Sequence, residues 1–462
     1  MITVSNVITI DSPSAELLKW CRQHLKLRNP EYTKKQRMHF WVGNTPEFLY
    51  LYETHGDKLV LPYGVLRNIL PMVNADEIKT GFAIPEKIDY HCEVPLYDYQ
   101  QKAVEEVYWK QYGILQSAAG SGKTQMAIQL IAKHGKRALF LTHTKDLLTQ
   151  AKQRAEQYMG AALLGTITEG KVNIGEGITF ATVQTMCNLD LAQYKDMWDV
   201  IIVDECHRVA GTPTAVSQFS KVLNSLSARH KYGLSATVHR SDGLIQATFA
   251  LLGDVVYTVP TEAVADKIMK VGILPVPTGI RIDRSCQNSD GTLNYAKLIG
   301  YLTESYKRNL RIVECIVENQ ENPSLILSDR LGHLETLMSM LPANIRKDAV
   351  MVSGKMTTKK GKAEREQAIE DMRSGAKKYL FATYSLAKEG LDVPRLERLY
   401  MVTPQKDYAV ITQAIGRIAR ISKGKADPVV YDFVDDIQYL VKAYKKRCTT
   451  YRKNGCYFVE GT

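Results

Sequence analysis

The sequence contains no long hydrophobic run, and this absence excludes a protein built around membrane-spanning helices. Nowhere in its 462 residues do apolar side chains approach the uninterrupted run of ~20 that a transmembrane helix needs. The first residues, MITVSNVITIDSPS, place no basic group before their short apolar stretch, so no signal peptide is expected. We therefore expect a cytoplasmic protein with no membrane partner.

Cysteine is scarce, and its spacing matches no metal-binding pattern. The chain has eight cysteines, and no two of them form a CxxC pair. Disulfide frameworks belong mainly to short secreted chains, whereas this chain is long. We expect reduced, mostly buried thiols and no structural zinc site.

The composition also excludes disordered, collagen-like and coiled-coil proteins. Hydrophobic residues make up 45% and charged residues 24% of the chain, which is ordinary for globular proteins. A chain of 462 residues is too long for one hydrophobic core, so two or three domains are expected. The net charge of +11 indicates a polyanionic partner, but charge alone leaves DNA, RNA and a membrane surface open.

Two series of short apolar runs indicate two α/β lobes. The first series is GILQS, RALFLT, ITFAT, DVIIV and YGLS, and the second is SLILS, DAVMV, YLFAT, RLYMV and PVVYDF. Near-continuous apolar strands that alternate with helical patterns predict parallel sheets covered on both faces. The polar, proline-containing stretch over roughly residues 258–300 is expected to be irregular and to hold the junction between the lobes.

The first 92 residues have a different pattern, which predicts a small α+β domain. Its expected strands are MHFWVG, EFLYLYE and KLVLPYG, and its expected helix runs from Ala15 to Leu27. Residues 19–37 hold seven Lys or Arg against Glu31 alone. This stretch is either a DNA-phosphate contact or a solvated helix surface. The predicted domains are residues 1–92, 93–265, the junction 266–300, and 301–462.

The segment SAAGSGKT is the strongest functional signal, because it follows a predicted strand and opens a helix. Its glycines let backbone N–H groups face phosphates at a helix N-terminus. Lys123 is placed to reach the β- and γ-phosphates, and the Thr124 hydroxyl to bind Mg²⁺. The segment therefore predicts binding of ATP and Mg²⁺ by Ser117, Gly120, Ser121, Gly122, Lys123 and Thr124.

Two further segments complete the predicted chemistry. DVIIVDECH ends a buried strand at Asp204, a predicted Mg²⁺ ligand, and Glu205, a predicted general base. His207 either couples this site to the other lobe or makes a structural hydrogen bond. In QAIGRIAR, Arg417 and Arg420 are three residues apart, which puts both on one face of a helix. We expect them to neutralise charge on the γ-phosphate.

The order of these segments resembles that of the superfamily 2 helicases over roughly residues 96–435. The segments that carry the resemblance are LYDYQ, SAAGSGKT, LTHTKDLLTQ, FATVQT, DECH, LSAT, SLILSDR, FATYSLAKEGLDVP and QAIGRIAR. HRSDG after SAT, together with QAIGRIAR, is similar to the XPB branch, which includes phage helicases of the UvsW type and poxvirus transcript-release helicases. Ser117 and Val238 depart from the family pattern, and neither change removes a catalytic group.

This resemblance implies two RecA-like parallel-sheet lobes and further site residues. Gln100 would bind adenine, Ser235, Thr237 and Gln413 would couple ATP to nucleic acid, and Gly390 and Asp392 would sense nucleotide. The residues that would contact the nucleic-acid backbone are Thr144, Lys145, Thr182, Gln184, Ser328, Arg330 and Thr383. The alternative for the hydroxyl residues is helix capping.

The activity that the resemblance implies is an ATP-dependent DNA helicase or translocase. It would unwind, reanneal or branch-migrate forked DNA, 3′→5′, in recombination, repair or replication, with other replication or recombination proteins as partners. An RNA-directed helicase, or the motor subunit of a restriction or defence complex, stays open. The tail after Asp436 carries six basic residues and four interleaved tyrosines. We expect its lysines to contact phosphates and its tyrosines to pack on the second lobe.

Overall fold

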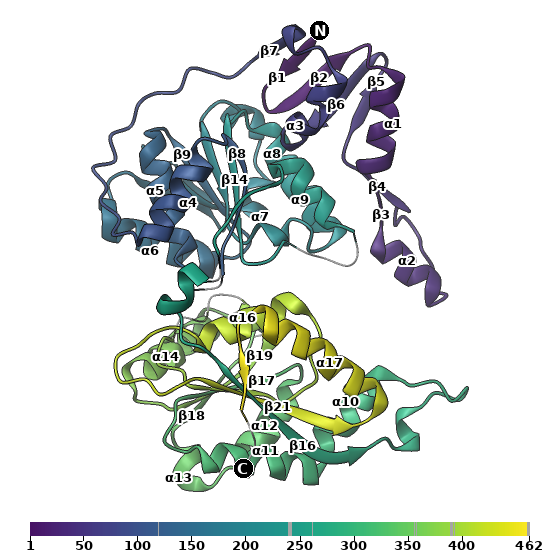
Figure 1. Cartoon of the computed structure of the whole chain (residues 1–462), viewed down its shortest axis with the longest axis vertical. Helices are drawn as coiled ribbons and strands as arrows, with labels where there is room; N and C mark the ends of the chain where they lie inside the picture. Colours follow the sequence, from purple (N-terminus) through teal and green to yellow (C-terminus); the bar gives the residue numbers. More distant parts are fainter. Residues whose placement is uncertain are drawn as a thin grey trace. The chain divides into compact units, whose positions relative to one another are not determined.

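The computed structural model describes residues 1–118, 120–238, 243–260, 262–354, 356, 358–388, 391 and 393–459. The chain divides into two compact units, the first made of Met1–Ala118 and Gly122–Pro260 and the second of Ala119–Ser121 and Thr261–Thr462. Each unit holds one large parallel sheet with helices on its faces (Figure 1). In the described part of the chain, no helix combines the length and the hydropathy needed to cross a bilayer.

The N-terminal domain is a small α+β domain, as predicted. Its mixed sheet has the order β5-β6-β2-β1-β7, and a separate hairpin pairs β3 with β4. The bounds are β1 (Ile2–Val4), β2 (Val7–Asp11), α1 (Ala15–His24), β3 (Lys26–Arg28), α2 (Pro30–Arg37), β4 (Phe48–Tyr50), β5 (Glu53–His55), β6 (Lys58–Pro62), α3 (Leu66–Ile69) and β7 (Ile78–Thr80). The prediction of a strand at MHFWVG is wrong, because these residues form a loop after α2.

The N-terminal domain shares its hydrophobic core with the first lobe. Tyr63 packs against Tyr112, with ring centroids 4.8 Å apart, and its hydroxyl donates to the Arg229 carbonyl at 3.1 Å. Leu59 and Leu61 of β6 belong to the same buried cluster as Tyr112. The two parts therefore fold as one body.

The first lobe is an eight-stranded sheet of order β11-β10-β12-β9-β13-β14-β8-β15, parallel except for the β10–β11 pair. Each apolar run of the first series forms a strand, as predicted. The bounds are α4 (Asp98–Tyr108), β8 (Tyr112–Gln116), α5 (Lys123–His134), β9 (Ala138–Thr142), α6 (Lys145–Met159), β10 (Leu164–Thr168), β11 (Lys171–Asn173), β12 (Ile178–Thr182), α7 (Val183–Met186), β13 (Val200–Val203), α8 (Pro213–Ser225), β14 (His230–Ser235), α9 (Ile245–Leu252) and β15 (Val255–Thr258).

The second lobe is a seven-stranded parallel sheet of order β18-β19-β17-β20-β21-β16-β22. Its bounds are β16 (Gly272–Arg281), α10 (Tyr295–Glu304), α11 (Tyr306–Glu318), β17 (Ser324–Ser328), α12 (Leu331–Met340), α13 (Ala343–Arg346), β18 (Ala349–Val352), α14 (Lys359–Ser374), β19 (Tyr379–Thr383), α15 (Tyr384–Lys388), β20 (Arg398–Met401), α16 (Tyr408–Ile418), β21 (Val429–Asp436), α17 (Gln438–Lys453) and β22 (Tyr457–Phe458).

The expectation of an irregular stretch over residues 258–300 is wrong for β16. This strand pairs with β21 along most of its length, but with β22 only at Gly272 and Ile273. Beyond Ile273, no strand of the described residues pairs with one side of β16, and such an edge tolerates the missing N–H groups of Pro275 and Pro277. The domain boundaries given above stay predictions.

The cysteines match their predicted environment, and the tail matches it in part. The eight cysteines are free, and six of them are buried. Of the tail tyrosines expected to pack on the second lobe, Tyr451 is buried in its core, whereas the prediction is wrong for Tyr439 and Tyr457, which are 37% and 44% exposed. Arg447, counted among the basic groups of the tail, is instead buried in an ion pair with Asp432, at 2.8 Å.

Candidate active site

The loop SAAGSGKT connects β8 to the N-terminus of α5. The Ser117 N–H donates to the Ser235 carbonyl at 3.0 Å, which ties the start of the loop to the end of β14. The Lys123 ammonium donates to the carbonyls of Ser117 and Ala118 at 3.4 and 3.5 Å. Gly122 has a φ of +80°, a left-handed conformation that favours glycine. The loop therefore curls around the end of the helix, as a phosphate-binding loop does.

Gln100 lies against this loop. It is buried in α4, and its Oε1 accepts the Tyr97 N–H at 2.9 Å. A Cβ added at Gly122 would lie only 2.3 Å from the Gln100 Nε2. Gly122 is thus required both by its backbone conformation and by the approach of Gln100.

Asp204 and Glu205 follow β13 at the same edge of the sheet. The Asp204 Oδ1 accepts the Glu205 N–H at 2.9 Å, and the Glu205 Oε1 lies 3.9 Å from the Lys123 Nζ. Burial, followed by the negative charge of Glu205, raises the pKa of Asp204 to about 7. A cation at this position would offset both effects.

The oxygen donors here fit Mg²⁺. Asp204 and Thr124, the second residue of α5, supply hard oxygen ligands of the kind that Mg²⁺ prefers. Within the described ranges no group of three or more His, Cys, Asp or Glu side chains could hold a metal ion alone. An ion at Asp204 would therefore share its coordination sphere with phosphate oxygens and water, as at other nucleotide sites.

Glu205 adopts a strained backbone. Its φ of +47° and ψ of +50° are left-handed, which is rare for a residue other than glycine and concentrates at functional sites. The strained residue is also the predicted general base. No local pattern in the sequence predicts this backbone conformation.

His207 and Ser235 extend the site. The His207 Nδ1 lies 3.3 Å from the Glu205 Oε2 and 3.1 Å from the Ser235 Oγ. The Ser235 hydroxyl donates to the Thr237 carbonyl at 2.6 Å, so Nδ1 is the donor in the His207–Ser235 hydrogen bond. The structural hydrogen bond predicted for His207 is therefore present, and a coupling function of these residues stays a prediction.

The nucleic-acid residues predicted in the first lobe lie at the ends of β9 and β12, which are neighbouring strands. Thr144 caps α6 by accepting the Leu147 N–H at 3.4 Å, and Thr182 donates to the Thr185 hydroxyl at 2.9 Å. Lys145 pairs with Glu169, and the exposed Gln184 donates to the His143 carbonyl. Helix capping, the alternative given above, is therefore what Thr144 does in this structure. The contacts of these four residues with nucleic acid stay predictions.

The nucleic-acid residues predicted in the second lobe lie at the ends of β17 and β19. Ser328 and Thr383 are paired across these two neighbouring strands. Ser328 is fully buried, and its hydroxyl accepts the Arg330 N–H at 3.1 Å. Thr383 forms a hydrogen bond with Ser385 at 2.9 Å, and Arg330 is exposed at the start of α12. Of the three, Ser328 therefore has its side chain turned into the fold.

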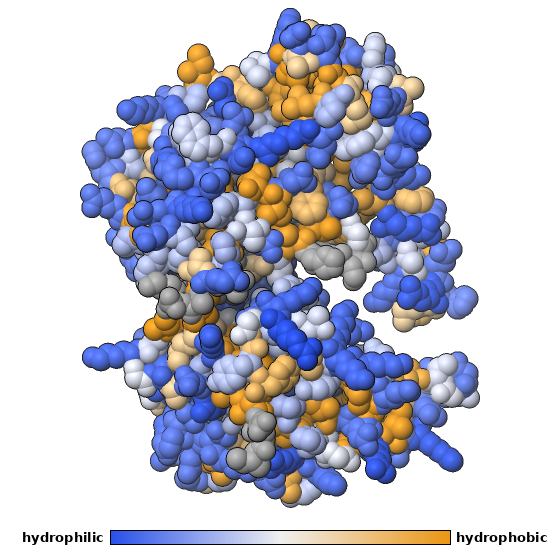
Figure 2. Space-filling model, in the orientation of Figure 1, coloured by the Kyte–Doolittle hydropathy of each residue, from blue (hydrophilic) through white to orange (hydrophobic). Residues whose placement is uncertain are grey.

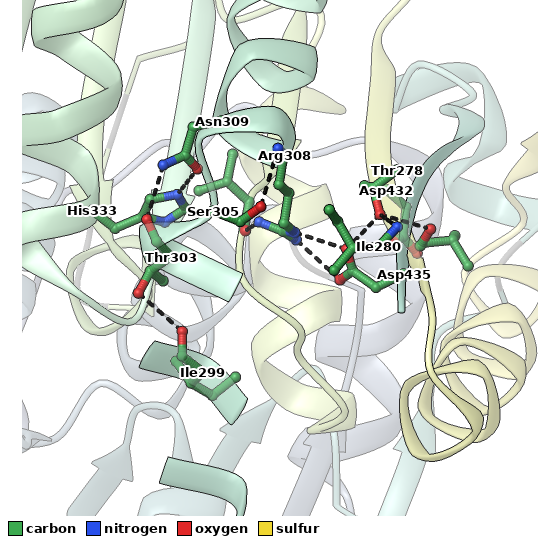
Figure 3. Close-up of polar contacts among 12 residues, drawn as sticks. Thr278, Ile280, Ile299, Thr303, Ser305, Arg308, Asn309, His333, Asp432 and Asp435 are labelled. Atoms are coloured by element: carbon green, nitrogen blue, oxygen red, sulfur yellow. Dashed lines mark hydrogen bonds and ion pairs between the residues drawn. The ribbon is translucent and has the colours of Figure 1, made fainter. Parts of the chain in front are cut away.

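A buried polar network holds this second edge together (Figure 3). Arg308 of α11 donates to Asp435 at 2.8 Å and to the Val402 carbonyl at 2.7 Å. The His333 Nε2 lies 2.9 Å from the Asn309 Oδ1, and its Nδ1 lies 3.2 Å from the Ser328 Oγ. Sequence reasoning missed this network, because its members come from elements far apart in the chain.

The prediction that Arg417 and Arg420 share one helix face is wrong. The helix α16 ends at Ile418, and Arg420 forms an isolated bridge with Ile268 beyond it. Arg417 is half-buried and donates to the Leu391 carbonyl at 3.0 Å. Gln413 is buried in α16. The predicted nucleotide sensors Gly390 and Asp392 lie outside the described residues.

His143 is a candidate that sequence reasoning missed. It follows β9, and within the described ranges neither of its buried ring nitrogens has a hydrogen-bond partner. Burial, followed by the charges of Arg208 and His207, lowers the pKa of His143 to about 3, so its ring is neutral. A polar residue directly after a buried apolar run was the signal available in the sequence, and the structure shows that β9 is the direct neighbour of β13, which precedes Asp204.

Two family models match the chain. One is described as type III restriction enzyme, res subunit, and covers residues 93–240. The other is described as helicase conserved C-terminal domain and covers residues 307–422. Together they cover both parallel sheets in large part.

Individual proteins match over most of the chain. A protein of Acanthamoeba polyphaga mimivirus named as ATP-dependent RNA helicase L396 is 27% identical over 347 residues, which are 74% of this chain and 64% of that protein. The chain thus spans less than two thirds of that relative. The DNA 3'-5' translocase XPB2 of Sulfurisphaera tokodaii is 24% identical over 378 residues, 72% of this chain and 83% of that protein. Dbp5 of S. cerevisiae shares the fold, with a TM-score of 0.53, 17% identity, and coverage of 79% of this chain and 94% of that one.

Proposed function

We propose that this chain, which belongs to the superfamily 2 helicases, is an ATP-driven translocase that unwinds, reanneals or branch-migrates forked or branched DNA with 3′→5′ polarity. The observation that carries the proposal is the meeting of Lys123, Asp204 and Glu205 where the phosphate-binding loop faces the end of β13. The name of the archaeal XPB2 relative supports DNA and the polarity. Recombination, repair or replication is the setting that we infer.

In the proposed mechanism, backbone N–H groups of the loop and the Lys123 ammonium bind the β- and γ-phosphates of ATP. Thr124 and Asp204 would hold Mg²⁺, which would neutralise phosphate charge when bound. The Glu205 carboxylate orients the attacking water and accepts its proton. Its Oε1 lies 3.9 Å from the Lys123 Nζ and its Oε2 lies 3.3 Å from the His207 Nδ1, so this carboxylate lies next to the phosphate-binding loop.

The nucleotide state would reach the nucleic acid through the contact of Glu205 with His207 and of His207 with Ser235. Ser235 also accepts the Ser117 N–H at its carbonyl, so the same residue touches the phosphate-binding loop. Arg417 and Arg420 are proposed to act on the γ-phosphate, as the family resemblance implies.

Replacing Lys123 by Ala tests the proposal. The variant should lose ATP hydrolysis by roughly 10²–10³-fold, because one preorganised charge on the transferred phosphate is removed. DNA binding in a filter or anisotropy assay should persist. Lys133→Ala, at the other end of α5, is the matched control and should hydrolyse ATP normally. Full activity in Lys123→Ala would contradict the proposal.

Two alternative functions have support of their own. The name of the mimivirus relative favours an RNA-directed motor, and the description of the first family model favours the motor subunit of a restriction complex. ATPase rates with single-stranded DNA, duplex, fork, four-way junction and RNA separate DNA from RNA motors. Stable co-purification with a nuclease or modification subunit would identify the restriction motor.

A further inference from the structure

A small arm projects from the N-terminal domain, outside the residues that either family model matches (Figure 1). The arm comprises residues 26–50, in which the antiparallel strands β3 and β4 form the stem and α2 with the loop 38–47 forms the tip. Leu27 and Leu51 anchor the stem in the domain core. The buried Asn29 donates to the Pro46 carbonyl at 2.8 Å and accepts the Glu31 N–H, which fixes α2 on the stem.

The tip of the arm exposes two large aromatic side chains to solvent. Trp41 is 87% exposed and Phe40 is 60% exposed. Gly43 has a φ of +51°, and a Cβ added there would lie 2.8 Å from the Trp41 ring. The backbone at Gly43 therefore lies close to part of the Trp41 indole, and most of the indole is exposed to solvent. Both rings are therefore accessible to a ligand.

The same arm has an excess of positive charge. It holds five Lys or Arg against two Glu, and both acids are already paired, Glu47 with Arg28 at 2.9 Å and Glu31 with Lys35 at 3.2 Å. Among the described residues, Lys34 and Arg37 have no ion pair with an acidic group, and both are exposed. Figure 2 shows the surface of this projection as mostly hydrophilic.

A groove next to the indole gives room for a ligand. Its volume is about 540 Å³, within the usual range of ligand sites. Trp41, Lys35 and Thr45 line it from the arm, and Thr214 and Ser217 line it from α8. Glu31, the ion-pair partner of Lys35, also lines the groove, and apolar side chains such as Leu49 and Pro213 complete its walls.

We propose that the arm binds single-stranded nucleic acid, with Trp41 stacking on an unpaired base and Lys34 and Arg37 contacting the phosphates. Exposed aromatics beside cations are how single strands are bound without sequence preference. A protein partner fits less well, because lysine is depleted in protein interfaces. The inference rests on the proposed function, since a nucleic-acid motor is what brings a single strand to this domain.

Anisotropy titrations with labelled oligothymidylate and oligouridylate test the proposal on the full chain. Trp41→Ala should weaken binding roughly tenfold, and Trp41→Phe should regain most of that loss, because stacking persists on a smaller ring. Trp109→Ala is the matched control, since Trp109 is 75% exposed elsewhere in the same unit, and its affinity should match wild type. The Lys34→Gln/Arg37→Gln variant should reduce the salt dependence, with a slope smaller by about 1 to 2. Because these two side chains are exposed, this variant also tests the arm should Trp41→Ala fail to fold.

Equal affinity of Trp41→Ala and Trp109→Ala for both oligonucleotides would overturn the inference. Equal weakness of Trp41→Phe and Trp41→Ala would overturn the stacking role. A wild-type chain whose ATPase does not respond to nucleic acid contradicts the proposed function itself. A responsive ATPase with unchanged affinity in Trp41→Ala removes only the role of the arm.

Discussion

The carboxyl ends of the strands form one edge in each parallel sheet, and the charged groups at the two edges differ in how closely they are paired. In the first lobe, Lys123 approaches carbonyls and Glu205 only at 3.4–3.9 Å. In the second lobe, Arg308 binds Asp435 at 2.8 Å with both groups fully buried. At the first edge, burial and the negative charge of Glu205 raise the pKa of Asp204 to about 7, and a bound cation would offset both effects. The second edge is already complete and serves to hold the fold.

Two histidines make the same contrast within one residue type. His143 in the first lobe and His333 in the second both have a pKa lowered to about 3 by burial. The His333 ring bonds to Ser328 and Asn309, whereas His143 has no hydrogen-bond partner in the described part of the chain. The difference predicts which edge tolerates substitution without loss of stability.

The largest expected effect is a loss of stability at the strand ends of the second lobe, where Arg308 pairs with Asp435. Arg308→Met should lower the free energy of unfolding by about 3–5 kcal/mol, because it leaves the buried Asp435 carboxylate without its cation. Urea denaturation followed by circular dichroism measures the loss. Arg311→Met, an exposed position on the same helix, is the control and should cost no more than about 1 kcal/mol. Equal effects would remove the contrast between the edges.

At the strand ends of the first lobe, Glu205→Gln should change the rate of ATP hydrolysis and leave the stability unchanged. ATP hydrolysis should fall about 100-fold, equivalent to about 2.7 kcal/mol of activation free energy, because the general base is lost. The unfolding midpoint should stay constant or rise, since the negative charge next to Asp204 is removed. Glu156→Gln, in a surface pair with Lys152, should leave the rate unchanged. Wild-type hydrolysis by Glu205→Gln would show that another group is the base.

Acid should destabilise the chain partly through His333. Its pKa is about 3 in the folded state against an ordinary 6.5, so only the unfolded state takes up this proton between those values. The stabilisation is complete above pH 6.5 and is lost as the pH falls, by about 2 kcal/mol at pH 5. Denaturation at pH 7 and pH 5 should show a smaller drop for His333→Gln than for wild type. An identical drop in both would contradict the buried neutral ring.

The smallest effect is expected at His143. His143→Leu should leave the stability at pH 7 unchanged or raise it by up to about 1 kcal/mol, because its ring makes no hydrogen bond with any residue that the structure describes. His333→Leu should instead cost about 1–3 kcal/mol, because Ser328 and Asn309 lose their partner. Thermal denaturation of the two variants side by side checks the difference. A larger loss at His143 would mean that its ring nitrogens do have partners.

Much of the fold was readable in the sequence, because buried parallel strands leave short apolar runs. The ends of those runs also located Asp204 and Thr182 correctly at the edge of one sheet. The strand β16 was missed because its prolines indicate a turn, and only its edge position makes them tolerable. Arg420 was misplaced because the helical spacing continues in the sequence past the point where α16 ends.

The sequence by itself determined the two lobes, the phosphate-binding loop and the acidic pair after β13, because each depends on residues that are neighbours in the chain. The tertiary structure decided which polar groups are satisfied: Ser328 and Arg308 turn inward to partners, while His143 stays without one among the described residues. It also decided the left-handed backbone at Glu205 and the exposure of Trp41. The physical reason is that hydrogen-bond partners and burial come from elements distant in sequence, which local patterns do not encode.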